Sequence, residues 1–278
     1  MADTSSPGSP QAPSAGGPRP DVRLPENPGG PDQDTECGLD QDTEYCSVRL
    51  DGTWQDIRFH DYDRIFAVPG LYETLFHDLL DCRSPDVVGK LLKEELQASG
   101  TDPASLRVLD LGAGNGLIAE QLRTVGAGYL VGVDLLDEAR RAALRDRPEV
   151  YDDYHVCDTA RLTAAWERTL AGHRFNALTC VAALGFGDIP VRAFATAVNL
   201  VADGGRIAFT IRDRFLSESD ESGFARFVRR CEREGLFEVR ARERYRHRLD
   251  VRGEPLYYLA VVATKHGDVP VAPSDGTD

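Results

Sequence analysis

Residues 107–122, which read RVLDLGAGNGLIAEQL, constrain the fold more than any other stretch of this 278-residue chain. An apolar run ends in an acid, three glycines alternate at Gly112, Gly114 and Gly116, and an amphipathic pattern follows at once. Glycine has no Cβ atom, so it permits a positive φ and a close approach of a ligand to the backbone. The unpaired N–H groups that open the next helix favour negative charge. The stretch therefore predicts a strand, a tight ligand-binding turn and a helix.

The rest of the chain repeats this order of strand and helix. Short runs rich in Val, Ile, Leu or aromatic residues predict strands at 106–111, 129–134, 153–157, 175–183 and 205–212. Apolar periodicity predicts helices at 85–98, 115–125, 136–146, 160–171, 190–200 and 221–234. Strands that alternate with helices pair in parallel, with helices on both faces of the sheet. Two final strands, at 236–247 and 255–264, have no helix between them. We expect an α/β fold: three αβα layers, doubly wound, around a mostly parallel seven-stranded sheet with an antiparallel C-terminal hairpin.

Composition divides the chain into three parts. Residues 1–45 are rich in Pro, Gly, Ser, Asp and Gln and have almost no aromatic or β-branched residues. Such a segment cannot bury enough apolar surface to offset its ordering entropy, so we predict an acidic disordered tail. We expect a single domain over 46–265, with a helical N-terminal cap at 46–100 and a Rossmann-like core at 105–265. Residues 266–278 are expected to form a flexible tail.

The residues around the glycines separate the ligands that could use such a turn. A P-loop requires Lys after its last glycine, whereas Leu117 follows Gly116. A dinucleotide-binding loop has its third glycine where Leu117 stands. Asp110, just before the turn, would repel a pyrophosphate and suits a ligand that carries a positive amine. An NAD-linked oxidoreductase remains an alternative, although the chain has no recognisable Tyr-x-x-x-Lys pair.

Together these segments resemble the class I S-adenosylmethionine-dependent methyltransferases. VLDLGAGNG at 108–116 looks like the first motif of that family, Asp134 ends the second core strand in YLVGVD, and Asp158 ends the third in HVCD. FNALTCVAALGFG at 175–187 and LVADGGRIAFTIR at 200–212 resemble the motifs of the next two strands. A glycine loop with acids ending three successive strands is a specific pattern. The chain departs from the family pattern at a few packing positions, which are Leu136, Ala139, Cys157 and Asp203.

The resemblance implies S-adenosyl-L-methionine as cofactor and a set of residues that bind it. Asp110 and the loop would take the methionine part, Asp134 both ribose hydroxyls, and Asp158 the adenine amine. Leu135 and Ala182 are placed to supply apolar walls for the adenine ring. The full set of expected cofactor-binding residues is Tyr62, Asp110, Gly112, Ala113, Gly114, Asn115, Gly116, Asp134, Leu135, Asp158, Thr159 and Ala182.

Within the family, the chain is most similar to small-molecule enzymes of the Williams–Beuren region methyltransferase-like type. VAALGFGDIPVRAF carries that likeness, and HDYDRIF at 60–66 resembles their N-terminal Y-D motif, in which a tyrosine helps to close the site. The resemblance therefore implies an enzyme that methylates a small-molecule acceptor. No catalytic residue is assigned: candidate bases are His60, His77, Asp188 and Asp213, and candidate acceptor-pocket residues are Tyr72, Phe186 and Phe215.

Charge and cysteine usage limit the remaining options. The net charge of −14 argues against a nucleic-acid partner. No apolar run approaches the ~18 residues of a membrane span, and no secretory signal is recognisable, so we expect a cytoplasmic protein without membrane contact. The six cysteines form no C-x-x-C pair and none stands beside a histidine, so we expect no metal site.

One pattern keeps a second alternative open. Arginines fall at every second position from 240 to 248, which in a strand would place them on one face. Such a face would be a solvated sheet edge or a site for an anionic acceptor or an acidic protein partner. A non-catalytic cofactor-binding module that acts on a partner therefore remains possible from sequence, and the oligomeric state is unknown.

Overall fold

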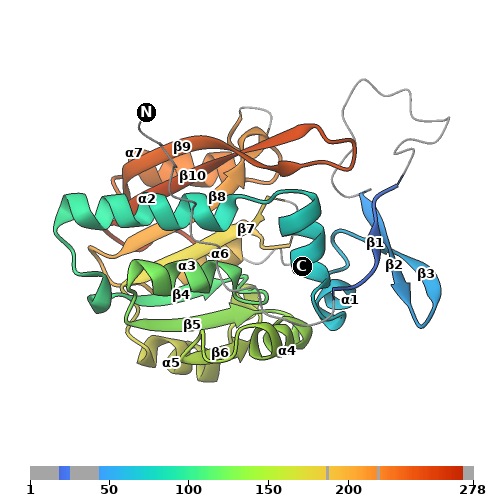
Figure 1. Cartoon of the computed structure of the whole chain (residues 1–278). Helices are drawn as coiled ribbons and strands as arrows, with labels where there is room; N and C mark the ends of the chain where they lie inside the picture. The colour runs from blue at the N-terminus through green and yellow to red at the C-terminus, as the bar shows by residue number, and fades with distance from the viewer. Residues whose placement is uncertain (1–18, 26–43, 186–187, 218–219, 272–278) are drawn as a thin grey trace, which may run out of the picture.

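The computed structural model describes residues 19–25, 44–185, 188–217 and 220–271. A seven-stranded sheet runs through the middle of the molecule, with helices on both sides (Figure 1). The strands lie in the order β6-β5-β4-β7-β8-β10-β9. Neighbours from β6 to β8 pair in parallel, and β10 is antiparallel to both β8 and β9. The strands are β4 (Arg107–Leu111), β5 (Tyr129–Asp134), β6 (Asp153–Val156), β7 (Ala177–Leu184), β8 (Arg206–Arg212), β9 (Phe237–Leu249) and β10 (Pro255–Lys265). The predicted αβα fold is confirmed.

Two apolar clusters pack the helices against opposite faces of this sheet. Buried residues of α2 and α3 form one cluster with the sheet, and those of α5, α6 and α7 form the other. Helix α4 packs against α1 of the N-terminal region. Among the described residues, no helix is both long and apolar enough to cross a bilayer. The helices are α1 (Tyr62–Ala67), the π-helical η2 (Glu73–Leu79), α2 (Ser84–Ser99), α3 (Leu117–Val125), α4 (Asp137–Asp146), α5 (Ala164–Gly172), α6 (Val191–Asn199) and α7 (Phe224–Arg233), with short 3₁₀ turns η3 (Pro103–Ser105), η4 (Thr159–Arg161) and η5 (Asp213–Leu216).

A small second sheet corrects the prediction for the N-terminal region. Strands β1 (Val22–Arg23), β2 (Tyr45–Leu50) and β3 (Thr53–Arg58) form an antiparallel sheet, which stands apart from the large one in Figure 1. The cap is therefore not purely helical. Cys46 and Val48 are buried while their neighbours are more exposed, a period-two pattern that a strand requires. The predicted disorder over 1–45 is also wrong for residues 19–25, because Val22 pairs with Val48.

Glu44 lies in the segment predicted to be disordered, yet it is one of the most buried acids. Its carboxylate pairs with the guanidinium of Arg248 and accepts the Val251 N–H at 3.0 Å. At the other end, Val269 is buried and its N–H donates to Asn199 Oδ1 at 2.8 Å, so the chain is still attached to the domain a few residues after 265, where a flexible tail was expected. The rest of both predicted tails, residues 1–18, 26–43 and 272–278, lies outside the described residues.

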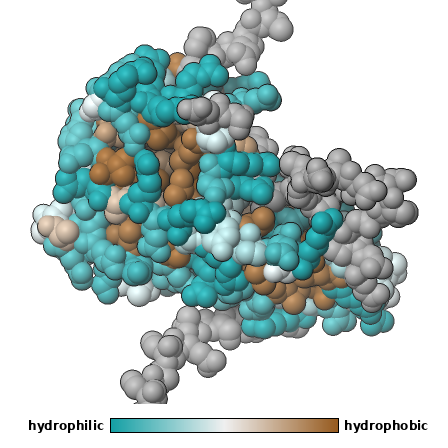
Figure 2. Space-filling model, turned by 90° about the horizontal axis from the view of Figure 1, so that it is seen from above, coloured by the Kyte–Doolittle hydropathy of each residue, from teal (hydrophilic) through white to brown (hydrophobic). Residues whose placement is uncertain are grey.

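The arginines of β9 do not share one face. In the β9–β10 pairing, Arg240 and His247 have no partner residue in β10. Each is therefore a β-bulge, after which the side chains of β9 alternate in the opposite sense. Arg240 Nε lies 3.5 Å from Glu95 on α2, whereas Arg242 lies 2.8 Å from Glu232 on α7, across the sheet. β9 is an edge strand of the large sheet. Seen from above, the surface of the molecule is mostly hydrophilic, with apolar residues gathered in two places (Figure 2). The expected single-sided arginine face is wrong.

Candidate functional site

A cavity of about 530 Å³ opens at the carboxyl edge of the parallel strands. Its floor comes from the ends of β4, β5 and β7, and its other wall comes from α1 and η2 of the cap. Doubly wound sheets bind ligands at this edge, and the volume lies within the ~300–1,000 Å³ typical of small-molecule sites. Of the expected cofactor-binding residues, the structure brings these to the cavity wall: Tyr62, Gly112, Ala113, Gly114, Asn115, Asp134, Leu135, Asp158, Thr159 and Ala182.

The glycine loop has the backbone that its sequence predicted. Gly112 and Gly114 have φ values of 69° and 51°, in the left-handed region that favours glycine. A Cβ atom on Gly112 would also lie only 2.8 Å from Ile189 Cδ1. Gly116 has a positive φ as well, but it faces Val150 and Tyr151 and does not line the cavity. It turns the chain into α3, and its predicted contact with the ligand stays a prediction.

Asp134 holds the loop in place at the end of β5. One carboxylate oxygen accepts the Gly114 N–H at 2.9 Å, and the other accepts the Leu136 N–H at 3.0 Å. Burial raises the pKa of Asp134, while these backbone hydrogen bonds oppose the increase. A carboxylate has about four lone-pair sites, so both oxygens keep acceptor capacity for a pair of ligand hydroxyls.

The side chain of Asp110, another expected cofactor-binding residue, does not line the cavity. It is completely buried, and it accepts hydrogen bonds from Tyr151 Oη at 2.6 Å and Thr179 Oγ1 at 2.7 Å. Side chains alternate along β4, so Asp110 points into the α3 side of the sheet with Val108. Burial raises its pKa to about 7. Tyr151 also donates to the Ala113 carbonyl at 3.3 Å, so Asp110 supports the loop from behind.

Asn115 joins the loop to the cap through a polar network that the sequence did not reveal. Its Nδ2 donates to Glu73 Oε1 at 2.5 Å, and the same oxygen accepts from Arg147 at 2.6 Å. Arg147 also pairs with Glu120 at 2.8 Å. Glu73 lies on η2 and Arg147 directly follows α4, so their meeting depends on tertiary packing and leaves no spacing signal in the sequence.

The far end of the cavity carries the residues expected to hold adenine. Asp158 caps η4, with Oδ1 accepting the Ala160 N–H at 2.8 Å, and Thr159 is buried beside it. Leu135 is 62% exposed at the rim. Ala182 has a φ of 57°, unusual for a residue with a Cβ atom, and its N–H donates to Thr210 Oγ1 at 2.7 Å. This bend interrupts the β7–β8 pairing and turns β7 toward the cavity.

An aromatic series forms the cap side of the cavity. Tyr62 stacks near Phe66, Phe66 stacks on Tyr72 with ring centres 5.1 Å apart, and Tyr72 contacts Phe76 at 4.9 Å. All four line the cavity. The sequence analysis named Tyr62 and Tyr72 but missed the two phenylalanines. Each phenylalanine lies four residues after one of these tyrosines, a helical spacing that could have identified it. Phe215 packs against Gly185 instead, and Phe186 lies outside the described residues.

His60 and Asp188 face each other in the cavity wall, although 128 positions separate them. His60 Nδ1 lies 3.0 Å from Asp188 Oδ2, and the two side chains are 24% and 32% exposed. His77 also lines the cavity, but it is largely exposed beside Asp78. Asp213 pairs with Arg244 at 3.0 Å outside the cavity wall. Of the four candidate bases, His60 and Asp188 alone are brought together.

A doubly wound sheet with a glycine loop and acids at its carboxyl edge defines the class of Rossmann-like enzymes that bind an adenosyl ligand. Residues 86–266 match a family model described as a methyltransferase domain, and the chain belongs to this family, the class I S-adenosylmethionine-dependent methyltransferases. The sequence-based expectations of family and of methyl donor are confirmed. That the cavity residues contact this donor remains a prediction.

Individual relatives match more narrowly. The chain is 32% identical over 113 residues to a ubiquinone biosynthesis O-methyltransferase of Thiobacillus denitrificans, covering 40% of this chain and 46% of that protein. The same enzyme of Neisseria meningitidis is 30% identical over 154 residues, covering 53% and 57%. The chain thus spans about half the length of these relatives. Among solved structures, magnesium protoporphyrin IX methyltransferase from Synechocystis is 18% identical with a TM-score of 0.45, covering 65% of this chain and 79% of that one.

Proposed function

We propose that this protein transfers the methyl group of S-adenosylmethionine to a hydroxyl group of a small aromatic acceptor, with His60 as general base. The observation that carries the proposal is the His60–Asp188 pair in the wall of an aromatic-lined cavity. The matched relatives are named O-methyltransferases, which favours oxygen as the acceptor atom.

The donor set in the cavity fits S-adenosylmethionine. A carboxylate at Asp134 suits two neighbouring hydroxyls, and a carboxylate at Asp158 suits an exocyclic amine. The loop around Gly112 and Gly114 would hold the methionine part against the backbone, with Leu135 and Ala182 against the adenine ring. When bound, the sulfonium supplies an activated methyl group and leaves as a neutral thioether.

The rest of the reaction falls to the side chains of this protein. A phenol keeps its proton at pH 7, so transfer to it gains from a base. A proton on His60 Nδ1 donated to Asp188 makes Nε2 the basic atom. The acceptor oxygen forms a bond to the methyl carbon as the carbon–sulfur bond breaks, and the hydroxyl proton passes to His60. The aromatic series from Tyr62 to Phe76 would position the acceptor ring and exclude water.

Calorimetric titration with S-adenosylmethionine, S-adenosylhomocysteine and NAD tests the binding half. We expect micromolar binding of the first two and none of NAD. Binding of NAD alone would restore the oxidoreductase alternative. The aromatic residues that line the cavity opposite the glycine loop favour an enzyme with a small-molecule acceptor over a non-catalytic module acting on a protein partner.

A panel of phenols and catechols, scored by S-adenosylhomocysteine release, tests the catalytic half. We expect His60→Asn to lower kcat by about 10²–10⁴ with unchanged donor affinity. The matched control is His266→Asn, a histidine that pairs with Glu238 away from the cavity. Full activity in His60→Asn would remove the base from the proposal.

We also propose that the protein acts in the cytoplasm on a small molecule and not on nucleic acid. The cysteines in the described part of the chain are all free thiols, which suits a reducing compartment. The net charge of −14 opposes binding to a phosphate backbone.

A further inference from the structure

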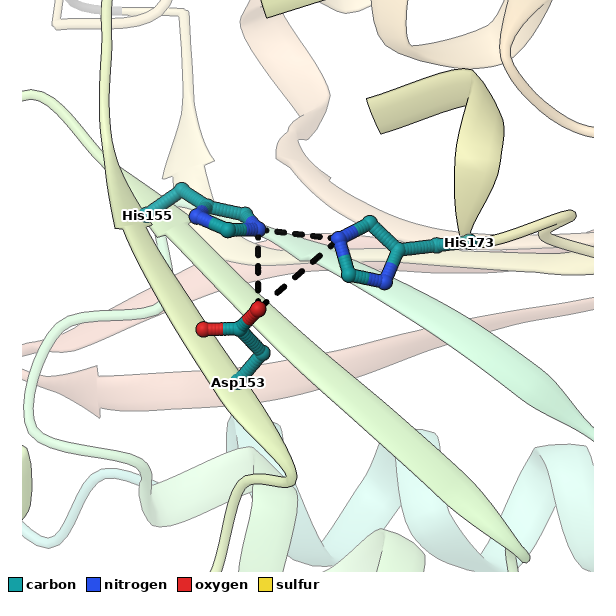
Figure 3. Close-up of side chains that lie close together, drawn as sticks. All are labelled: Asp153, His155 and His173. Carbon is teal, nitrogen blue, oxygen red and sulfur yellow. Dashed lines mark hydrogen bonds and ion pairs between the residues drawn. The ribbon is translucent and has the colours of Figure 1, made fainter. Parts of the chain in front are cut away.

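Three side chains with metal-binding atoms converge at the edge of the sheet, away from the cavity. Asp153 and His155 are two residues apart in β6, so both side chains point from the same face of that strand. His173 follows α5 and points back toward them, as Figure 3 shows. None of the three lines the cavity. β6 is the edge strand on this side and has only four residues.

The distances between the three potential ligand atoms suit a small cation. His155 Nε2 lies 2.9 Å from His173 Nε2 and 3.3 Å from Asp153 Oδ2, and His173 Nε2 lies 3.9 Å from the same oxygen. A tetrahedral zinc ion with bonds of about 2.0–2.1 Å holds its ligands about 3.4 Å apart. The observed distances bracket that value, so a metal at the centre of the triangle would require only small side-chain adjustments.

The surroundings orient His173 toward this centre. Tyr129 Oη lies 3.1 Å from His173 Nδ1, so a proton on Nδ1 donated to the hydroxyl leaves the Nε2 lone pair facing the cluster. Metal-binding histidines characteristically use their second nitrogen in this way. The backbone carbonyl of His173 accepts from Arg107 Nε at 2.7 Å, and the ring stacks on Phe175. Trp166 packs edge-on against His155 and shields the other side.

We propose that Asp153, His155 and His173 bind a divalent transition metal, zinc above all, with solvent completing the coordination. Two imidazoles favour zinc and its neighbours over magnesium or calcium, which prefer oxygen. Asp153 is partly exposed and leaves the site open to water. The simpler interpretation is a hydrogen bond between two histidines beside an acid. The two interpretations differ in one consequence: a metal would link the short strand β6 to the turn after α5, and so would stabilise the fold.

Chelator-treated full-length protein provides the test. We expect calorimetry with zinc chloride to show one equivalent bound at low micromolar Kd or tighter, and zinc at 100 µM to raise the Tm by several degrees. Magnesium at the same concentration should leave the Tm unchanged. Cobalt(II) should give the visible absorption of a nitrogen and oxygen site. A charge-transfer band from a thiolate would assign the metal to a cysteine and overturn the proposal.

Variants make the assignment specific. His155→Gln and His173→Gln should each weaken zinc binding more than 100-fold and remove the Tm increase. Tyr129→Phe keeps all three ligands and should weaken binding by about 10–100-fold. His266→Gln, which changes an exposed histidine elsewhere, should bind zinc like the parent protein. If either His155→Gln or His173→Gln binds zinc with parental affinity, or if the parent protein binds none, the site does not exist.

Discussion

The glycine loop and the cap face each other across one cavity. The residues that hold the loop in place are close to it in sequence, whereas the residues that hold the cap in place are far from it. The loop is local: Asp134 binds the Gly114 N–H only 20 residues away. The cap is attached through partners far along the chain, since Glu44 pairs with Arg248 and Ser84 bonds to His247 at 2.6 Å. The glycine loop and the carboxylate of Asp134 that holds it therefore belong to one short segment of the chain. The cap wall of the cavity depends on the C-terminal hairpin, which reaches back to the N-terminal region.

Breaking the long-range attachment should have the largest effect. Glu44→Gln leaves the Arg248 guanidinium buried without its counter-charge, so we expect a loss of about 3–5 kcal/mol in the free energy of unfolding. Urea denaturation measures it. The control is Glu232→Gln, which breaks the more exposed pair with Arg242 and should cost no more than about 1 kcal/mol. Equal losses in the two variants would mean that the cap does not depend on the buried pair.

The next prediction concerns the support behind the loop. The pKa of Asp110 rises from 3.8 to about 7 on folding, so the folded state holds this proton more tightly than the unfolded chain. The stabilising contribution is complete below pH 3.8 and is lost as pH rises to about 7.

Asp110→Asn has no such proton to lose. Its stability relative to the parent should therefore increase by up to ~4 kcal/mol between pH 4 and pH 8, an upper value because neighbouring groups relax. Thermal or urea unfolding at a series of pH values measures the difference. A difference that does not change with pH would show that Asp110 is ionised throughout.

The smallest expected effect concerns the glycine-loop side of the cavity, where Asp134 is expected to bind the cofactor. Asp134→Ala should weaken S-adenosylmethionine binding by roughly 2–4 kcal/mol, the scale of two hydrogen bonds to a charged group. Calorimetry gives the affinity. Asp137→Ala, three residues later and paired with surface arginines, is the matched control and should bind normally. Unchanged affinity in Asp134→Ala would place the ribose elsewhere.

The regions predicted well and those predicted poorly differ in a physical way. The strand at 129–134 and the helix at 190–200 lie within one residue of β5 and α6, because apolar periodicity is a local signal. The N-terminal hairpin was missed because Cys46 and Val48 show only a short alternation between polar residues. Asp110 was placed in the site because it precedes the glycine turn and by family resemblance, whereas strand alternation directs its side chain into the core.

The sequence by itself determined the αβα sheet, the glycine turn, and the positions of Asp134 at the end of β5 and Asp158 just after β6. It could do so because the hydrophobic period and a positive φ depend on adjacent residues. Tertiary structure alone decided which side chains meet. Two bulges in β9 sent its arginines to different faces, and packing brought His60 to Asp188 and His173 to His155. Such contacts depend on register and on the paths of distant segments, and no local pattern of residues encodes either.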